Sequence, residues 1–287
     1  MAQKDISKGI VQLIRKAETE LPKDVIVALK NAYELEKGIA KTQLEVMLKN
    51  IDVARKTGRP ICQDTGVQTF FVKVGLDFPH INTLKDLITD GVKKATVVVP
   101  LRPNNVDPFT GKNHGKNDSW DDVLSITWDF VKGSDAVITA FPKGGGSENM
   151  SKLKMFEPSA GIEGVKDFVV SEMIKAGGNP CPPTVVGVGI GGGADLAMKL
   201  GKIALLRPVG VRHKDKTIAK MEEELIRRIN KSGIGPMGLG GKTTVLDVHI
   251  EKAHRHPASL PVGLVVQCWA ARKADMIIHA DGTFEVK

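Results

Sequence analysis

The sequence predicts an α+β fold in which mixed β-sheets are flanked by helices and a helical segment comes first. Three observations favour it: the first 58 residues carry apolar residues at helical spacing, strand-like alternation begins after residue 60, and the two patterns then mix without a regular βαβ rhythm. The chain has 287 residues, 41% hydrophobic and 26% charged. One compact domain over residues 1–287 is the simplest interpretation.

Three helices are expected in the first 58 residues. The first has apolar residues at helical spacing, namely Ile6, Ile10, Leu13, Ala17 and Leu21. Pro22 suits the first turn of a second helix, where its missing N–H costs nothing, and Gly38 is expected to end that helix. The segment 42–45, Thr-Gln-Leu-Glu, has the spacing of a capping box, so a third helix is expected to begin there and end at Gly58.

Strands and further helices are expected in the rest of the chain. The expected strands are 69–74, 126–130, 136–140, 184–190, 244–250 and 262–268. The second and third of these flank Lys-Gly-Ser-Asp at 132–135, which is typical of a β-hairpin. Helical spacing returns at 164–176 and 214–230.

Composition restricts the classes of partner. No apolar run approaches the about 20 residues that cross a bilayer, and the N-terminus has no signal-peptide core, so we expect a cytoplasmic protein without membrane association. The net charge of +8 is compatible with a solvated lysine-rich surface or with attraction to an anion. The chain has no block of five Lys or Arg and few aromatic residues, which argues against a nucleic-acid partner.

Two glycine clusters have only part of a nucleotide-binding motif. A G-x-G-x-x-G pattern runs from Gly187 to Gly192 after a strand, but Gly201 ends the following helix early and the expected acidic residue is absent. Close backbone packing at a strand-to-helix turn is the other interpretation. The segment 240–244, Gly-Gly-Lys-Thr-Thr, lacks the first glycine of a P-loop, since Pro236 stands there. A nucleotide-binding enzyme is therefore a distant alternative.

The three cysteines, Cys62, Cys181 and Cys268, lie far apart in the sequence. Their odd number without a secretory signal favours reduced thiols. Free cysteines are usually core residues, yet Cys62 lies among polar residues and Cys181 among prolines. No C-x-x-C pair supports zinc, whereas three thiolates can hold an iron–sulfur cubane with one open iron. Asp64 would then suit proton transfer; the alternative is an Asx turn with the two residues after it.

Five motifs in this order resemble the iron–sulfur hydro-lyase alpha region of class I fumarases and L-tartrate dehydratases. They are the segments 61–66, 143–150, 182–193, 235–244 and 254–261, which together extend over nearly the whole chain. The resemblance implies a [4Fe–4S] cluster on Cys62, Cys181 and Cys268.

The resemblance also implies which residues meet the substrate. They are Gln63, Asp64 as an acid–base group, Arg102 on a carboxylate, and the backbone around Gly145. His256, or alternatively His254, is the implied proton relay; either is otherwise an ordinary surface or core histidine.

The family's second half, with a catalytic threonine and further basic residues, has no counterpart here. The resemblance therefore implies the alpha subunit of a hetero-oligomer whose separate beta subunit completes the site and supplies the base. Alone, the chain is expected to assemble a cluster but to catalyse little. The implied reaction is the reversible hydration of fumarate, a small dicarboxylate, to L-malate, with the open iron as Lewis acid.

The sequence is compatible with two further alternatives. Dehydration of L-tartrate to oxaloacetate differs by a substrate hydroxyl, and the sequence does not separate it from fumarate hydration. A non-catalytic protein that binds anions or nucleic acid belongs to another class, and its binding would weaken steeply with salt.

Overall fold

The computed structural model describes residues 2–113, 115, 117 and 125–287, which form helices and two mixed β-sheets. This confirms the expected α+β class. The chain divides into two compact units: unit 1 comprises Met1–Pro22, Asn50–Gly144 and Arg272–Lys287, and unit 2 comprises Lys23–Lys49 and Gly145–Ala271. The expected single domain over residues 1–287 stays a prediction.

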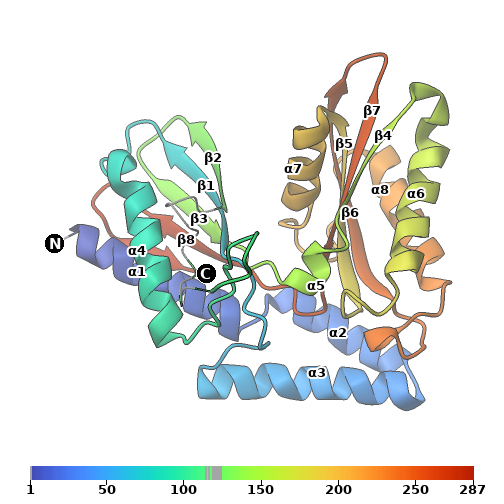
Figure 1. The fold of residues 1–287 in the computed structure, drawn as a ribbon, viewed down its shortest axis with the longest axis horizontal. Helices are drawn as coiled ribbons and strands as arrows, with labels where there is room; N and C mark the ends of the chain where they lie inside the picture. The colour runs from blue at the N-terminus through green and yellow to red at the C-terminus, as the bar shows by residue number, and fades with distance from the viewer. Residues whose placement is uncertain (1, 114, 116, 118–124) are drawn as a thin grey trace. The chain divides into compact units, whose positions relative to one another are not determined.

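Unit 1 is a five-stranded sheet with two long helices (Figure 1). The helices are α1 (Ala2–Thr19) and α4 (Leu84–Val98), the latter preceded by the 3-10 turn Ile81–Thr83. In spatial order the strands are β2 (Ser125–Val131), β1 (Thr69–Gly75), β3 (Ala136–Ala140), β8 (Ala274–Ile278) and β9 (Phe284–Val286). Strands β1 and β2 are parallel, and the other pairs are antiparallel.

The core of unit 1 lies between these helices and the sheet. Ile6, Ile10 and Leu13 recur at helical spacing on α1 and are fully buried, as are Ile88 and Val92 on α4. Each such aliphatic side chain contributes roughly 1.5–3 kcal/mol of burial free energy. The periodicity that predicted the first helix therefore reflects its packing against the sheet.

The expected hairpin at 126–140 is wrong, although both strands exist. Strand β1 lies between β2 and β3, so these two strands do not pair with each other. The connection at 132–135 instead crosses the end of β1, where the Gly75 N–H donates to Asp135 O and the Asp77 N–H donates to Gly133 O. Turn residues mark a chain reversal, but they do not exclude a third strand between the two arms.

Unit 2 is built on a four-stranded sheet. In spatial order its strands are β4 (Lys152–Phe156), β7 (Leu260–Gln267), β5 (Thr184–Gly192) and β6 (Val245–Arg255). Its helices are α2 (Lys23–Leu35), the first part of α3 (Gly38–Thr57), α5 (Gly145–Glu148), α6 (Gly161–Ala176), α7 (Ala194–Ala204) and α8 (Lys216–Asn230). Two 3-10 turns, Pro158–Ala160 and Pro236–Gly238, complete it.

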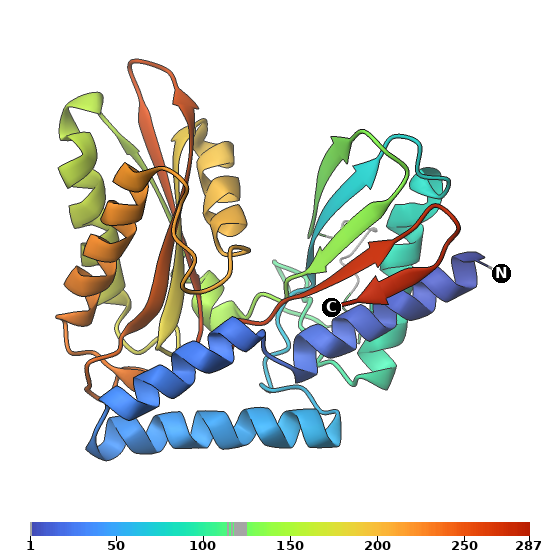
Figure 2. The same cartoon turned by 180° about the vertical axis from the view of Figure 1, so that it is seen from behind.

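Helices cover both faces of this sheet. Figures 1 and 2 show α7 on one face and α6 with α8 on the other. Helix α7 packs against glycines: a Cβ on Gly189 would lie 2.0 Å from the carbonyl oxygen of Ala197. The glycines of the G-x-G-x-x-G pattern therefore allow close backbone packing, because the backbone of α7 fills the space beside β5. Gly201 lies inside α7 and does not end it, which corrects our expectation.

The start of the third helix also differs from expectation. Helix α3 begins at Gly38 rather than at a capping box, and Gly38 has a φ of 55°. The Thr42 hydroxyl donates to the Gly38 carbonyl within the helix, at 3.3 Å. A hydroxyl four residues into a helix can bond back to the preceding turn, so the spacing alone was misleading.

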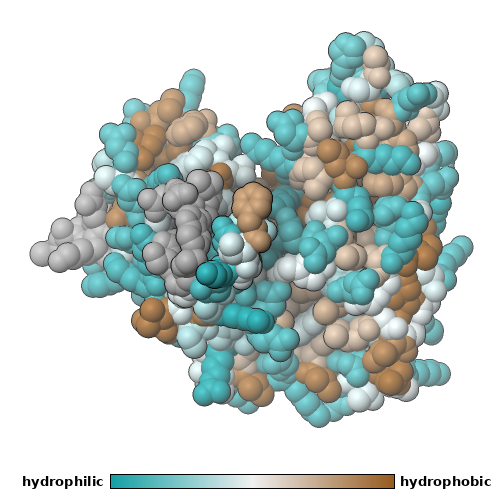
Figure 3. Space-filling model, in the orientation of Figure 1, coloured by the Kyte–Doolittle hydropathy of each residue, from teal (hydrophilic) through white to brown (hydrophobic). Residues whose placement is uncertain are grey.

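The surface is mixed in polarity. Figure 3 shows hydrophilic residues interspersed with hydrophobic ones on one face. None of the helices in the described residues is long and apolar enough to span a membrane.

Candidate functional site

The segment that carries Cys62 is fixed by its buried neighbour. It follows the end of α3, where Gly58 has a φ of 64°. The Ile61 N–H donates to Glu18 O on α1 at 2.9 Å, and Asn50 Nδ2 donates to Ile61 O at 2.8 Å. Ile61 is itself buried. A loop held at both polar groups of one residue presents the next residue, Cys62, in a defined place.

Asp64 forms an Asx turn, which is the alternative interpretation of this residue given above. Its Oδ1 accepts from the Gly66 N–H at 2.9 Å and from Asn104 Nδ2 at 3.2 Å. Its Oδ2 lies beside Gly144, where an added Cβ would come within 3.1 Å of it. The turn orients the carboxylate, and this is compatible with a second role for Oδ2.

Two of the sequence motifs meet beside this carboxylate. Val67 and Lys143 form an antiparallel bridge in which each N–H donates to the other's carbonyl at 3.0 Å. A Cβ on Gly66 would lie 2.6 Å from the backbone of Lys143, and Gly66 has a φ of 69°. Glycine is required at this close approach. The next glycine, Gly145, starts α5 in unit 2 and is exposed.

A buried ion pair holds the backbone of the Asp64 segment. Arg272 Nη1 donates to Glu18 Oε2 at 2.6 Å, and the two side chains are only 1% and 0% exposed. Arg272 Nη2 donates to the Asp64 carbonyl at 2.9 Å, and Gln68 Nε2 donates to Glu18 Oε1 at 2.9 Å. Burial raises the pKa of Glu18. The charge of Arg272 and the hydrogen bond from Gln68 act in the opposite direction, but the effect of burial is larger.

Sequence reasoning missed this ion pair and Asn104. The ion pair could have been suspected from the sequence, because Glu18 lies on the apolar side of an amphipathic helix. A buried charge needs a partner. The partner, Arg272, lies 254 residues away, and no local pattern points to it.

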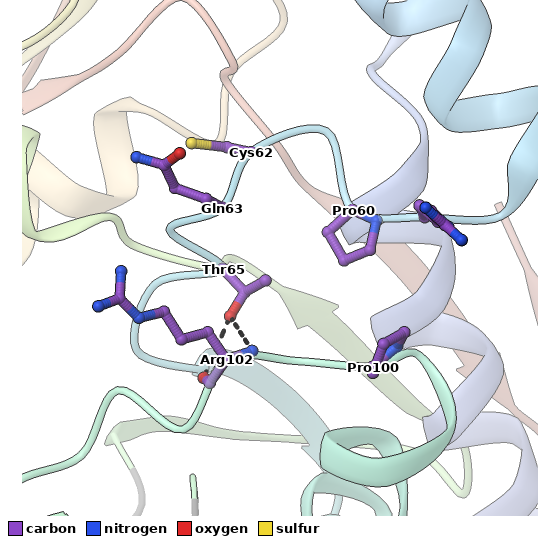
Figure 4. A pocket seen from close by; sticks show the side chains of 7 residues that line it. Pro60, Cys62, Gln63, Thr65, Pro100 and Arg102 are labelled. Atoms are coloured by element: carbon purple, nitrogen blue, oxygen red, sulfur yellow. Dashed lines mark hydrogen bonds between the residues drawn. The ribbon is translucent and has the colours of Figure 1, made fainter.

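Arg102 and Cys62 line the same pocket. The Arg102 N–H donates to Thr65 Oγ1 at 3.2 Å, and this hydroxyl lies 3.3 Å from Arg102 O. Figure 4 shows the side chains of Cys62, Gln63 and Arg102 projecting to the same side. The pocket has a volume of about 520 Å³. Its lining contains the residues Arg59, Pro60, Cys62, Gln63, Thr65, Pro100 and Arg102.

The charge of this pocket favours anions. Two guanidinium groups line it, and no carboxylate is among the lining residues. Arg102 is exposed, so its five N–H donors are accessible to a ligand. Guanidinium groups bind carboxylates through paired N–H donors, so a small carboxylate fits this opening.

Cys181 and Cys268 lie at one end of the two inner strands of the sheet of unit 2. Cys181 comes before β5 and Cys268 follows β7, and these strands pair antiparallel with Val185 opposite Gln267. The Trp269 N–H donates to Cys181 O at 3.1 Å. Antiparallel neighbours bring the start of one strand beside the end of the other. Two cysteines that are 87 residues apart in the sequence therefore lie at the same end of the sheet.

The thiols suit sulfur ligation of a metal cluster. No disulfide joins the three cysteines, and each is half-buried. Cys181 has a φ of 53°, a backbone conformation that side-chain-bearing residues rarely adopt. As the side chains stand, no three His, Cys, Asp or Glu residues within the described ranges form a group that could hold a metal ion.

The candidate histidines lie at the other end of β7. His254 and His256 are exposed near the turn between β6 and β7, where the Ala258 N–H donates to His256 Nδ1 at 3.1 Å. Eight residues of β7 separate this turn from Cys268, roughly 25 Å at about 3.3 Å per residue. Within unit 2, the structure thus does not bring His256 to the cysteines, and its role as a relay stays a prediction.

The P-loop-like segment already holds an anion from the chain itself. Glu36 Oε1 accepts from the Lys242 N–H at 2.7 Å and from the Thr243 N–H at 2.6 Å, and Glu36 is buried. These amides would face phosphate in a P-loop. The carboxylate of Glu36 occupies these amides, which agrees with the incomplete P-loop motif in the sequence.

The comparisons with known proteins agree with this arrangement of motifs. The sequence model of the family described as fumarate hydratase (Fumerase) matches residues 7–277. The chain therefore belongs to this family of hydro-lyases, as its motifs suggested.

Similar proteins come from archaea and bacteria. The chain is 51% identical to the "Putative L(+)-tartrate dehydratase subunit alpha" of Methanocaldococcus jannaschii, over 96% of this chain and 98% of the relative. It is 41% identical to the L(+)-tartrate dehydratase subunit alpha of Escherichia coli O157:H7, over 93% of this chain and 88% of the relative. The protein of that name from Shigella sonnei is 40% identical, with the same coverage.

Proposed function

We propose that this protein is the alpha subunit of a [4Fe–4S]-dependent hydro-lyase that dehydrates L-tartrate to oxaloacetate. The observation that carries the proposal is the pocket of unit 1, where Cys62, Gln63 and Arg102 share one opening. The names of the relatives favour tartrate over fumarate, which is the reverse of the preference expected from the sequence. Fumarate hydration remains the second candidate, because the matching family is described as fumarate hydratase.

Substrate capture is assigned to the pocket. Arg102 holds one carboxylate through paired N–H donors, and its backbone bonds to Thr65 fix where the side chain begins. Gln63 is exposed beside Cys62 and can donate to, or accept from, a substrate hydroxyl. The backbone around Gly145 is assigned to the same substrate as a prediction from the resemblance.

Proton transfer is assigned to Asp64. Its Oδ1 is engaged by two donors, so the carboxylate cannot rotate freely, and Oδ2 is the atom proposed to receive or give the proton. Arg272 holds the main chain at the same residue. A positioned acid–base group of this kind contributes typically 10²–10⁴-fold to a rate.

Cys62, Cys181 and Cys268 are proposed to hold the cluster. When bound, a [4Fe–4S] cluster with three protein ligands supplies a Lewis-acidic iron for a substrate oxygen. The proposal requires that the sulfur of Cys62 joins those of Cys181 and Cys268 in the assembled enzyme. The exposed His256 is proposed as a proton relay only in that assembly.

A separate beta subunit is proposed as the partner. The relatives are named as alpha subunits, and each of the two named first is matched over at least 88% of its length. We propose that the partner supplies the remaining substrate contacts and the base, so that this chain alone turns over little.

The test is a paired assay of the anaerobically reconstituted complex with its beta subunit. L-tartrate and fumarate are supplied separately, and oxaloacetate and L-malate are measured. A kcat/KM at least tenfold higher for L-tartrate supports the first candidate, and the reverse ratio supports the second. No turnover of either substrate by a complex that contains about four iron and four sulfide per alpha chain would reject both.

A further inference from the structure

We propose that unit 2 carries a second ligand site, for a small monocarboxylate with an apolar body, at the ends of β5 and β6. The site is a pocket of about 520 Å³, lined by α6, α8 and these two strands. Its volume lies within the range of about 300–1,000 Å³ that is usual for small-molecule sites.

The floor of this pocket is apolar. It is formed by Ile190 of β5, Ile218 and Met221 of α8, and Ile250 of β6, and Ile162 of α6 adds a further apolar side chain. Ile218, Met221 and Ile250 belong to the buried core of unit 2, whereas Ile162 is 51% exposed at the opening. An apolar ligand that covers this floor gains about 25 cal/mol for each Å² removed from water.

The rim of the pocket is positively charged. Four lysines and two carboxylates line it. Lys252 pairs with Asp215 at 3.0 Å, and Lys166 pairs with Glu224 at 2.7 Å. In the described part of the chain, neither Lys216 nor Lys220 has a salt-bridge partner, so the lining carries two uncompensated positive charges.

These two lysines are close neighbours on one helix face. Lys216 and Lys220 stand at i and i+4 on α8, and both are exposed. Like charges at this spacing destabilise a helix by a few tenths of a kcal/mol. A bound anion between them would relieve this repulsion while its apolar part covers the floor.

The position in the sheet also fits a ligand site. Strands β5 and β6 are parallel neighbours, with Val188 opposite Ile250 and Ile190 opposite Lys252. The pocket lies at the carboxyl-terminal part of both strands, since it is lined by Ile190, Ile250 and Lys252. Two adjacent strands and two helices therefore enclose the pocket from different sides.

The chemistry favours a carboxylate over a phosphate. The lining contains Asp215 and Glu224, which repel a dianion more than a monoanion. No arginine lines the pocket, so the forked donor geometry that suits phosphate is absent among the described lining residues. This distinguishes the site from the pocket of unit 1, which is lined by two arginines.

The test is calorimetric titration of the full chain with octanoate at pH 7. We expect saturable binding of one octanoate per chain, with weaker binding of octyl phosphate and of the uncharged octanol. Methyl NMR of Ile218 and Ile250 is expected to report the same saturation. An excess of L-tartrate is expected to leave octanoate binding unchanged, which separates this site from the proposed active site.

Two variants locate the site. Lys216→Gln with Lys220→Gln is expected to weaken octanoate binding about 10–100-fold, the range for loss of charged hydrogen bonds. Ile162→Trp is expected to fill the opening and abolish binding; since Ile162 is half exposed, the fold should tolerate the change. Lys30→Gln with Lys199→Gln removes the same charge at exposed positions outside the pocket and serves as the control.

The outcomes decide the proposal. Octanoate that does not saturate, or that binds the double lysine variant within twofold of the parent, overturns it. Tighter binding of octyl phosphate than of octanoate overturns the choice of a carboxylate, and equal binding of octanol overturns the role of the lysines. A failure of the tartrate assay leaves each of these readouts intact.

Discussion

The two units position their candidate cysteines by different means. In unit 1, Cys62 lies in an irregular segment that is held by single polar contacts to Glu18, Asn50 and Arg272. In unit 2, Cys181 and Cys268 lie at the ends of two paired strands. The first arrangement depends on a few side chains, whereas the second depends on a ladder of backbone hydrogen bonds.

This difference predicts how each half of the candidate site responds to change. Removal of one buried polar partner leaves an uncompensated group in unit 1. A strand ladder distributes the same role over many backbone groups, so single side chains matter less there. Substitution of the cysteines themselves should erase this distinction, because all three are proposed as ligands.

The largest effect is therefore expected for the ligands. Cys62→Ser, Cys181→Ser and Cys268→Ser should each prevent stable assembly of the cluster, measured as loss of visible absorption and of iron after anaerobic reconstitution. Turnover with the beta subunit should fall to background in all three. Circular dichroism serves as the folding control, and a folded Cys181→Ser protein with normal iron content would contradict the proposed ligand set.

Asp64→Asn should separate chemistry from assembly. The amide retains an oxygen that can accept from Gly66, so the turn and the cluster are expected to persist. It cannot take up the substrate proton, so kcat should fall about 10²–10⁴-fold. The iron content and the kcat are both measured, and an unchanged kcat would remove Asp64 from the mechanism.

Arg272→Met tests the dependence of unit 1 on single partners. It leaves Glu18 buried without its cation, and the expected loss is about 3–5 kcal/mol in the opening free energy of α1 and β8, measured by hydrogen exchange. Burial raises the pKa of Glu18 above 4.5, so this carboxyl destabilises the fold as the pH rises through that folded pKa. The loss should therefore shrink as the pH falls toward 4.5.

Arg227→Met serves as the control for this variant. Arg227 is exposed on α8, so its removal should change stability by less than about 0.5 kcal/mol. Equal losses for the two variants would show that burial of the ion pair has no special weight.

Arg102→Gln should weaken substrate binding more than chemistry. Loss of a charged hydrogen bond to a carboxylate predicts an increase in KM of about 10–100-fold with a smaller change in kcat. Arg55→Gln, at an exposed position of α3 outside the pocket, is the matched control. If both variants leave KM unchanged, Arg102 does not hold the substrate.

The smallest effect is expected in unit 2 at acid pH. Burial acts to raise the pKa of Asp247, but hydrogen bonds from His249, Arg212 and the Gly210 N–H outweigh it, so this pKa lies below its usual 3.8. A carboxyl with a lowered pKa stabilises the fold above pH 3.8, and that contribution is lost as the pH falls through the folded value. The protection factors of β6 amides, which are exchange rates relative to the intrinsic rate at the same pH, should therefore fall below pH 4.

Asp247→Asn provides the comparison for this prediction. The variant is less stable at pH 7, because Arg212 loses one of its two buried carboxylate partners, but its protection factors should vary less with pH between 4 and 2. The same pH dependence in both proteins would show that another carboxyl is responsible.

Local patterns predicted much of the fold correctly. The expected strand at 69–74 is β1 (Thr69–Gly75), and the expected helix at 214–230 is α8 (Lys216–Asn230), because periodic burial leaves a periodic sequence. Helix α4 was not predicted, although Leu84, Ile88 and Val92 repeat at helical spacing. The pairing of β1 between β2 and β3 has no local signal, since it depends on which strands meet in space.

The sequence by itself determined the composition class, which needs only residue counts, and the family motifs with their candidate residues, because each motif lies within a few neighbouring positions. Only the tertiary structure decided that Gly66 meets Lys143, that Glu18 pairs with Arg272, and that Cys181 and Cys268 lie at the same end of a sheet. These contacts join residues that are remote along the chain. Their formation depends on strand register and on the requirement that buried polar groups find partners, and neither can be read from a single segment.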